Sequence, residues 1–461
     1  MRKERDSMGE MQVPDDAYYG AQTQRAIENF SVSGIPIPSS MIRALGMIKR
    51  SAAVVNHDLG NLDKARRNAI IEAADEVITG KFDEQFLVDV FQTGSGTSSN
   101  MNTNEIIANR ASEIMGGVVG SRAPVHPNDH VNYGQSSNDV IPTSIHVAAN
   151  IEIEKSLIPT LELLADSLAK KADKFDGIVK IGRTHLQDAT PIRLGQEFSG
   201  YVQQIRNGIT RIKNSQGLLS ELAQGGTAVG TGINTHIEFG SRIAKELSNL
   251  SGVNFIEATN HFEAQAAQDA AVETSGALKT LAVSLSKIAN DIRWLGSGPH
   301  AGLGELTLPA VQPGSSIMPG KVNPVICESM IQVCAQVIGN DTAITIGGMG
   351  GVFELNLMLP VIAHNLLQSI HILNGACNMF KIKLVDNLEA NKKVCADYIE
   401  CSLAMCTSLA PVIGYDKAAH LAHVAYETGK TVREIALEEN VLPKDELNRL
   451  LDPRSMTEPN S

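Results

Sequence analysis

A long proline-free stretch limits the fold of this chain more than any other feature. No proline occurs between Pro191 and Pro299, so the stretch can hold several uninterrupted helices. Within it, six aliphatic residues are spaced 3, 4, 3, 4 and 3 apart: Leu278, Leu281, Leu285, Ile288, Ile292 and Leu295. This heptad-like spacing predicts a helix that packs along its neighbours over many turns.

Two further segments repeat the pattern, one formed by Leu157, Leu161, Leu164 and Leu168 and a shorter one by Ile205, Ile209 and Ile212. Three such segments in one region predict a bundle of long helices. Aromatic residues make up only 4% of the chain, which suits helix packing better than a β-sandwich. Strand patterns are sparse, and residues 178–181 are the best candidate.

We therefore expect a mainly α fold with three parts. Residues 1–134 are predicted to form an N-terminal, mainly helical domain, in which helical stretches alternate with glycine-rich turns. Residues 135–389 contain the predicted central bundle, and residues 390–461 a small C-terminal helical domain with short helices separated by Pro411, Gly414 and Pro443.

Charge and cysteine content exclude several classes of function. The formal net charge is −12 and no extended basic run is present, so nucleic acid and anionic membrane surfaces are unlikely partners. The six cysteines form no Cys-x-x-Cys pair, and we expect neither a metal site nor a disulfide framework. The N-terminal segment is charged and no apolar window is long enough to cross a membrane, which predicts a cytoplasmic protein.

Four polar, glycine-punctuated segments interrupt the helical pattern: residues 92–100, 135–139, 182–185 and 314–324. Their serine, threonine and asparagine side chains, with the backbone N–H groups, can hold an oxyanion without a metal. The same residue types also form ordinary helix caps and turns. Any one segment alone is more simply explained as a cap or turn.

The 314–324 segment contains Gly-Lys but does not fit a phosphate-binding loop. A Walker A loop has four residues between its glycines, and a serine or threonine after the lysine. Here five residues separate Gly314 from Gly320, and Val322 follows Lys321. Pro324 can instead open a helix whose N-terminus directs nearby donors toward an anion.

Several long motifs in order resemble one family. The 314–324 segment resembles the characteristic loop of the fumarase/aspartase superfamily. Similarity to class II fumarases extends across nearly the whole chain, through residues 6–10, 19–24, 125–132, 182–191, 225–232 and 353–356. The resemblance implies a three-domain fumarase/aspartase-like fold and a lyase that needs no cofactor or metal. It also implies a homotetramer whose active sites are shared between subunits and act on a small dicarboxylate.

The resemblance further implies roles for individual residues. Ser315 would remove a proton from carbon, assisted by Lys321, while His185 and Glu328 would act on the oxygen side through a water. Substrate binding would fall to Ser95, Gly96, Thr97, Ser136, Ser137, Asn138, Thr184, Ser316, Lys321, Val322 and Asn323. A second anion site would include His126, Pro127, Asn128 and Asp129, although Asn and Asp there could equally hold a turn.

The reaction within the superfamily depends on two positions. Aspartases commonly carry Gln and Ala where this chain has His185 and Gly320, so hydration of fumarate to malate, a tricarboxylic acid cycle step, is the expected reaction. Val325 and Ile326 are more reminiscent of aspartases. Aspartate ammonia-lyase activity and a non-catalytic structural homologue therefore stay open as alternatives.

Overall fold

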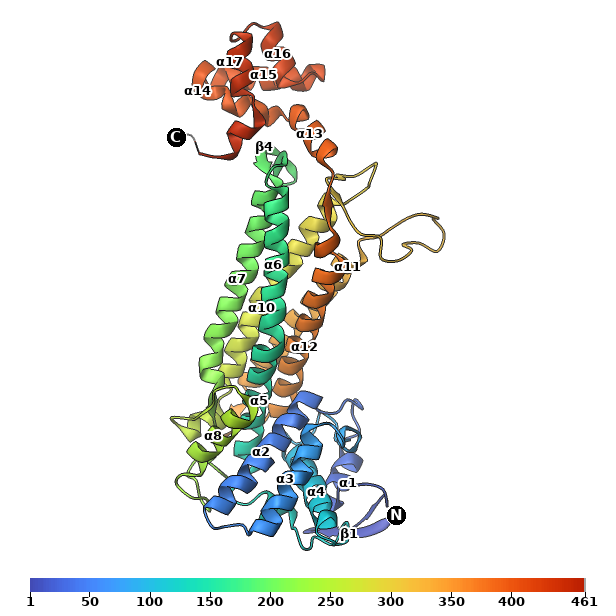
Figure 1. Cartoon of the computed structure of the whole chain (residues 1–461), viewed down its shortest axis with the longest axis vertical. Coiled ribbons are helices and arrows are strands. Elements are labelled where there is room, and N and C mark those ends of the chain that lie inside the picture. Colours follow the sequence, from blue (N-terminus) through green and yellow to red (C-terminus); the bar gives the residue numbers. More distant parts are fainter. Residues whose placement is uncertain (460–461) are drawn as a thin grey trace. The chain divides into compact units, whose positions relative to one another are not determined.

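The computed structural model describes residues 1–459 and is mainly helical, as predicted. It contains two compact units. Unit 1 comprises Met1–Pro159, Gly208–Ala282 and Val333–Gly375; unit 2 comprises Thr160–Asn207, Val283–Gln332 and the chain from Ala376 onward. The unit boundaries fall within or beside five long helices (Figure 1): α6 (Ile158–Phe175), α7 (Leu194–Leu219), α10 (Asp269–Leu295), α11 (Val325–Gly348) and α12 (Leu359–Lys383).

The three predicted apolar seams are helical and buried. The seam from Leu278 to Leu295 lies in α10, and every residue of it is at most 5% exposed. The other two lie in α6, with Leu157 just before it in η3 (Ile153–Leu157), and in α7. Their burial confirms that heptad-like spacing marks the packed faces of long helices here.

Unit 1 is built mostly from the helices before residue 159. The hairpin β1 (Arg2–Asp6) and β2 (Gly9–Val13) precedes α1 (Ala21–Asn29), α2 (Ser39–Asp58), α3 (Lys64–Ile78), η1 (Asp83–Gln85), α4 (Thr97–Ile114), η2 (Pro127–Val131) and α5 (Ser137–Glu152). Later segments add α8 (Phe239–Ser251), α9 (His261–Ala266), the parallel pair β5 (Glu221–Leu222) and β6 (Ile256–Glu257), and the antiparallel pair β8 (Gly351–Val352) and β9 (Leu355–Asn356).

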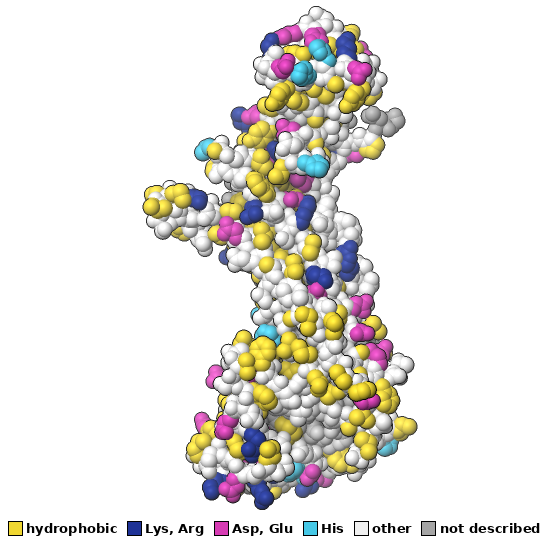
Figure 2. Space-filling model, turned by 180° about the vertical axis from the view of Figure 1, so that it is seen from behind, with side chains coloured by type: hydrophobic (Ala, Val, Ile, Leu, Met, Phe, Trp, Pro, Cys, Tyr) yellow, Lys and Arg dark blue, Asp and Glu magenta, His cyan; other side chains and the backbone are white. Residues whose placement is uncertain are grey.

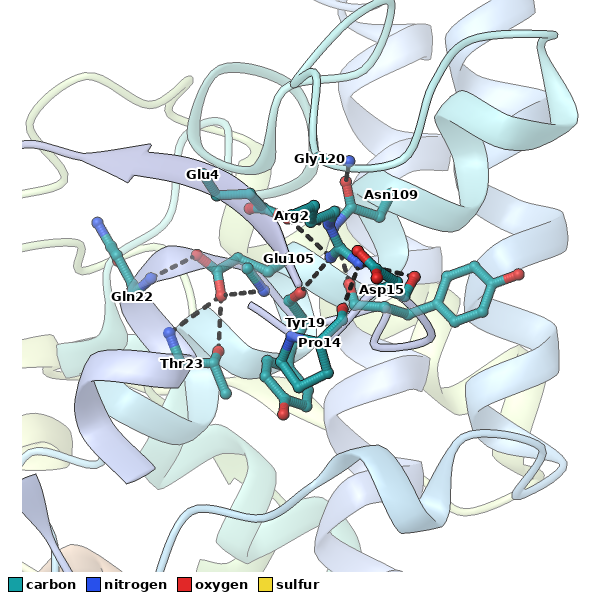
Figure 3. Close-up of polar contacts among 12 residues, drawn as sticks. Arg2, Glu4, Pro14, Asp15, Tyr19, Gln22, Thr23, Glu105, Asn109 and Gly120 are labelled. Carbon is teal, nitrogen blue, oxygen red and sulfur yellow. Dashed lines mark hydrogen bonds and ion pairs between the residues drawn. The ribbon is translucent and has the colours of Figure 1, made fainter. Parts of the chain in front are cut away.

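A buried carboxylate joins α1 to α4 in this unit (Figure 3). Glu105 on α4 is 4% exposed and accepts hydrogen bonds from the backbone N–H groups of Gly20, Gln22 and Thr23 and from the Thr23 hydroxyl. These N–H groups belong to the start of α1, where no intrahelical acceptor is available. The 19–24 motif therefore anchors α4, whose own N-terminus carries Ser95, Gly96 and Thr97.

Unit 2 contains two antiparallel strand pairs and the C-terminal helices. The first pair is β3 (Val179–Thr184) with β4 (Gln187–Arg193), which confirms the strand predicted near residues 178–181 and extends it into a hairpin. The second is β7 (Leu306–Thr307) with β10 (Glu389–Ala390), beside η4 (Val385–Asn387). The remaining elements are α13 (Lys392–Cys401), η5 (Leu403–Ser408), α14 (Ala410–Ile413), α15 (Tyr415–Thr428), α16 (Val432–Glu438), α17 (Lys444–Leu450) and η6 (Pro453–Thr457).

The segment after residue 390 has an apolar core of its own. Ile399, Leu409, Leu421, Ile435 and Leu447 belong to this buried cluster. The three-part division at residues 134 and 389 stays a prediction, because the two compact units follow a different partition of the chain. Within residues 1–459, no helix has the length and apolar character that crossing a membrane requires.

Candidate active site

The first polar segment forms the tight entry to α4. Gly96 precedes the helix with φ +70°, and the hydroxyl groups of Ser95 and Thr97 lie 2.8 Å apart in a hydrogen bond. A Cβ on Gly94 would lie 1.9 Å from the carbonyl oxygen of Leu357, so only glycine fits there. The close approach fixes the loop, and the helix N-terminus supplies backbone donors of the kind that bind anions.

The second polar segment forms the N-terminus of α5. Ser136 and Asp139 make a capping box: the Ser136 hydroxyl accepts from Asn138 N–H, and Asp139 accepts from Ser136 N–H. The other oxygen of Asp139 accepts from Gly225 N–H at 3.1 Å and Thr227 N–H at 2.9 Å. Burial raises the pKa of Asp139 to about 6, against the lowering effect of these three donors.

These two helix N-termini lie together within unit 1. Asn100 on α4 donates to the Ser137 hydroxyl oxygen at 3.0 Å, and a Cβ on Gly96 would lie 2.9 Å from the Ile141 side chain on α5. The structure thus brings the predicted binding residues 95–97 and 136–138 into one neighbourhood. Two helix N-termini that converge form a suitable environment for a carboxylate.

The predicted second anion site adjoins this region. His126 caps η2: its Nδ1 accepts from the N–H groups of Asn128 and Asp129 at 3.2 and 3.1 Å, in the turn that the alternative interpretation expected. Asn128, Asp129 and Ser136 line one cleft of about 870 Å³, which residues 227–228 and 233–236 also border. Cap and anion site are compatible, because the cap uses Nδ1 and leaves Nε2 available.

In unit 2, Thr184 and His185 occupy the exposed tip of the β3–β4 hairpin. His185 and Leu186 have φ values of +57° and +60°, a left-handed pair that suits a two-residue hairpin turn. For non-glycine residues this conformation costs energy. Thr184, His185 and Leu186 are all exposed at this tip.

The 314–324 segment is a loop closed on itself. Gly314 N–H donates to the Lys321 carbonyl at 2.8 Å, and the Asn323 amide donates to the Gly314 carbonyl at 2.6 Å. The Ser315 hydroxyl oxygen accepts from the N–H groups of Ile317 and Met318 at 3.2 and 2.9 Å. Two N–H dipoles aimed at this oxygen favour developing negative charge on it.

The remaining predicted residues lie around the same loop. Ser316, Lys321 and Val322 are exposed, and α11 begins at Val325, directly after Pro324, with Glu328 in its first turn. Figure 1 shows the loop before α11 projecting away from that helix. Among the described residues of a single chain, no hydrogen bond or ion pair joins His185 to Ser315, Lys321 or Glu328.

From the sequence, Asn100 and Asp139 fall in the polar segments without a role of their own, and Lys49 is overlooked. Asp139 stands three residues after Ser136, the spacing of a capping box, and this signal could have found it. Lys49 lies on α2 and is fully buried. Nothing in its local sequence separates it from an exposed lysine.

No group of three or more His, Cys, Asp or Glu side chains able to hold a metal ion occurs in the described part of the chain. The donors brought together are instead hydroxyl, amide and backbone N–H groups. Their chemistry suits binding of carboxylates.

Comparisons with known proteins identify the family. A lyase family model matches residues 9–339, and a fumarase C C-terminal model matches residues 405–458. The chain is 59% identical to a class II fumarate hydratase of Halobacterium salinarum, over 99% of this chain and 97% of that protein. It is 52% identical to the human mitochondrial fumarate hydratase, over 99% of this chain and 90% of that protein.

A solved structure agrees with this result. The crystal structure of a class II fumarase from Schistosoma mansoni superposes with a TM-score of 0.97 at 41% identity and covers all of both chains. The folds therefore correspond from end to end. The chain is a lyase of the fumarase/aspartase superfamily and belongs within it to the class II fumarase family.

Proposed function

We propose that this protein catalyses the reversible hydration of fumarate to (S)-malate, a step of the tricarboxylic acid cycle. The full-length relationship to class II fumarate hydratases carries the proposal. The site chemistry supports it, since two converging helix N-termini and neutral hydroxyl and amide groups suit a dicarboxylate. Gly320 and His185 support hydration over loss of ammonia.

Elimination of water from malate requires removal of a weakly acidic proton next to a carboxylate. Ser315 is proposed as the base, because its oxygen already receives two backbone N–H groups that would stabilise its alkoxide. The resulting aci-carboxylate would be held by fixed donors of the binding loops, which supply most of the rate enhancement. Elimination is proposed to be anti, so the hydroxyl leaves from the opposite face.

On that opposite face, His185 and Glu328 are proposed to act through a bound water that carries the proton to the leaving oxygen. Carboxylate binding is assigned to the residues named for it, which include Thr184, Ser316, Lys321, Val322 and Asn323. Lys321 makes no ion pair within residues 1–459, so its charge is available for a substrate carboxylate.

We further propose that the sites form between subunits of a homotetramer. Within one chain, His185 has no hydrogen bond with Ser315 or Glu328, so another copy would have to supply partners. Hydrophobic side chains are visible on the face shown in Figure 2. Each of the five long helices exposes a large apolar residue by 46% or more: Leu163, Leu218, Val283, Ile346 and Ile382.

Subunit complementation tests this arrangement. Alone, Ser315→Ala should be inactive and His185→Gln should have strongly reduced activity. If sites combine loops from different copies, co-expression of the two variants should restore part of the activity. Differently tagged subunits verify that the two variants have assembled together. If such a mixed assembly restores no activity, the proposal of shared sites is contradicted. A monomer mass for the active wild type in light scattering would contradict the tetramer.

The reaction itself is tested with purified protein and three substrates in parallel: malate, aspartate and argininosuccinate. Malate alone should produce the ultraviolet absorbance of fumarate. Fumarate from aspartate alone would establish an ammonia-lyase, and no turnover of any substrate would favour a non-catalytic homologue. We place the protein in the cytoplasm, a proposal supported by six cysteines of which none forms a disulfide in the described chain.

A further inference from the structure

A buried hydrogen-bond chain runs from α2 to the substrate loop at α5. The Lys49 ammonium donates to the amide oxygens of Asn132 at 2.8 Å and Gln135 at 3.0 Å. The Asn132 oxygen also accepts from the amide nitrogen of Asn100 at 3.3 Å, and the same nitrogen donates to the Ser137 hydroxyl oxygen at 3.0 Å. All of these residues belong to unit 1.

The direction of each bond in this chain is determined by groups that have only one role. An ammonium can only donate, so it requires an oxygen of Asn132 in front of it. The nitrogen of Asn132 donates to the Gln135 carbonyl, which can only accept. The Asn132 amide is therefore held from both ends, and its oxygen faces Asn100.

Asn100 therefore points its amide nitrogen toward the Asn132 oxygen and donates to it, because an amide oxygen in that place would face another acceptor. This orientation leaves the Asn100 oxygen buried and without a hydrogen-bond partner. An unpaired buried amide oxygen is unfavourable. The neighbouring Lys49 is fully buried, and burial lowers its pKa to about 7 against the opposing effect of Asp139. The network therefore retains two unfavourable features.

We propose that Lys49 and Asn100 are positioning residues that orient the Ser137 hydroxyl as a hydrogen-bond donor to a substrate carboxylate. Because Ser137 accepts a bond from Asn100 on its inner side, its own proton is not needed there. The hydroxyl can then direct that proton toward the ligand. This inference rests on the proposed function, in which Ser137 contacts a dicarboxylate.

Asn100→Asp is the sharpest test, because it keeps the size of the side chain and replaces the donor by an acceptor. Ser137 would then donate inward and lose its donor role toward the ligand. Asn104→Asp is a matched control: Asn104 is equally buried and donates to the same Asn132 oxygen at 3.1 Å, but no hydrogen bond links it to Ser137. Both substitutions place a carboxylate beside the Asn132 oxygen, so both should reduce the stability of the protein by similar amounts.

The measurement is competitive inhibition by succinate, a dicarboxylate that cannot react, with the purified full-length protein and fumarate as substrate. Asn100→Asp should weaken succinate about 10- to 100-fold more than Asn104→Asp, the loss expected for one hydrogen bond to a charged group. In a Ser137→Ala background the additional effect of Asn100→Asp should disappear. A merely structural role would persist in that background.

Equal inhibition constants for Asn100→Asp and Asn104→Asp, or an undiminished effect in the Ser137→Ala background, would overturn the inference. If either aspartate variant fails to fold, Asn100→Ala and Asn104→Ala replace them: Asn100→Ala removes the donor that fixes the Ser137 hydroxyl, so it should weaken succinate more than Asn104→Ala does, although by a smaller factor than Asn100→Asp. Wild-type protein that neither turns over fumarate nor binds succinate would instead refute the proposed function. The two failures are therefore distinguishable.

Discussion

Removal of the Glu105 carboxylate should weaken the attachment of α1 to α4 by a calculable amount. Oε2 accepts from Gly20 N–H at 2.9 Å, Thr23 N–H at 3.1 Å and the Thr23 hydroxyl at 2.6 Å; Oε1 accepts only from Gln22 N–H at 3.0 Å. Glu105→Gln can keep its single oxygen at the Oε2 position. It then loses one bond, which costs about 1–3 kcal/mol for an unsatisfied donor.

Glu105→Ala loses all four bonds. The Thr23 hydroxyl can turn elsewhere, so three backbone N–H groups are left without an acceptor, at a combined cost of about 3–6 kcal/mol if water reaches some of them. Burial raises the pKa of Glu105, whereas the four donors lower it. The expected order of stability is therefore wild type, then Glu105→Gln, then Glu105→Ala.

Hydrogen exchange followed by mass spectrometry measures the local stability of each segment. The method therefore does not require the large chain to unfold in two states. Peptides covering residues 19–29 should exchange faster in the same order, whereas peptides from residues 415–428 in unit 2 serve as a control. Glu105→Lys should be worse than alanine, because it places a cation against the N-terminus of α1. Wild-type protection in Glu105→Ala, or identical exchange in the Gln and Ala variants, would refute the reasoning.

Four further predictions concern the site and its scaffold. Ser315→Ala should abolish turnover and retain succinate binding; near-normal rates would remove Ser315 from the role of base. His185→Gln should lower kcat about 10²–10⁴-fold with a normal far-ultraviolet circular dichroism spectrum. Gly94→Ala should disrupt the entry to α4, because its Cβ would lie 1.9 Å from the Leu357 carbonyl oxygen, and succinate inhibition should weaken markedly. Asp89→Asn should remove an acid-dependent contribution to stability. Burial by itself raises the pKa of Asp89, but hydrogen bonds from the N–H groups of Phe91, Ser33 and Gly34 outweigh this effect and lower the pKa from 3.8 to about 2. That contribution, about 2 kcal/mol, is complete above pH 3.8 and lost as pH falls through about 2, so acid titrations of the two proteins should converge.

Much of the fold follows from local sequence patterns. The seam from Leu278 to Leu295 predicted α10, because its spacing is a property of a single helix and needs no partner to be read. The β3–β4 hairpin was harder to predict from the sequence, because only residues 178–181 had strand character. Its turn uses His185 and Leu186 in left-handed conformations that their residue types do not favour.

The candidate site shows the same contrast. Residue types in the 92–100, 135–139 and 314–324 segments marked them as polar loops, and their order in the chain indicated the family. The sequence could not indicate that Asn100 touches Ser137, that Asp139 holds residues 225 and 227, or that Lys49 is buried. Each depends on which helix faces which, since hydrogen bonds between distant segments exist only once packing brings their atoms within about 3 Å.

The sequence by itself thus determined the helical class, the buried seams and the identity of the polar loops, because periodicity and residue chemistry are local properties. Tertiary structure alone decided that the N-termini of α4 and α5 converge and that the buried Lys49 contacts Asn132 and Gln135. Tertiary structure likewise decided that Glu105 ties the 19–24 motif to α4. These features arise from contacts between residues that stand tens of positions apart, which no local pattern encodes.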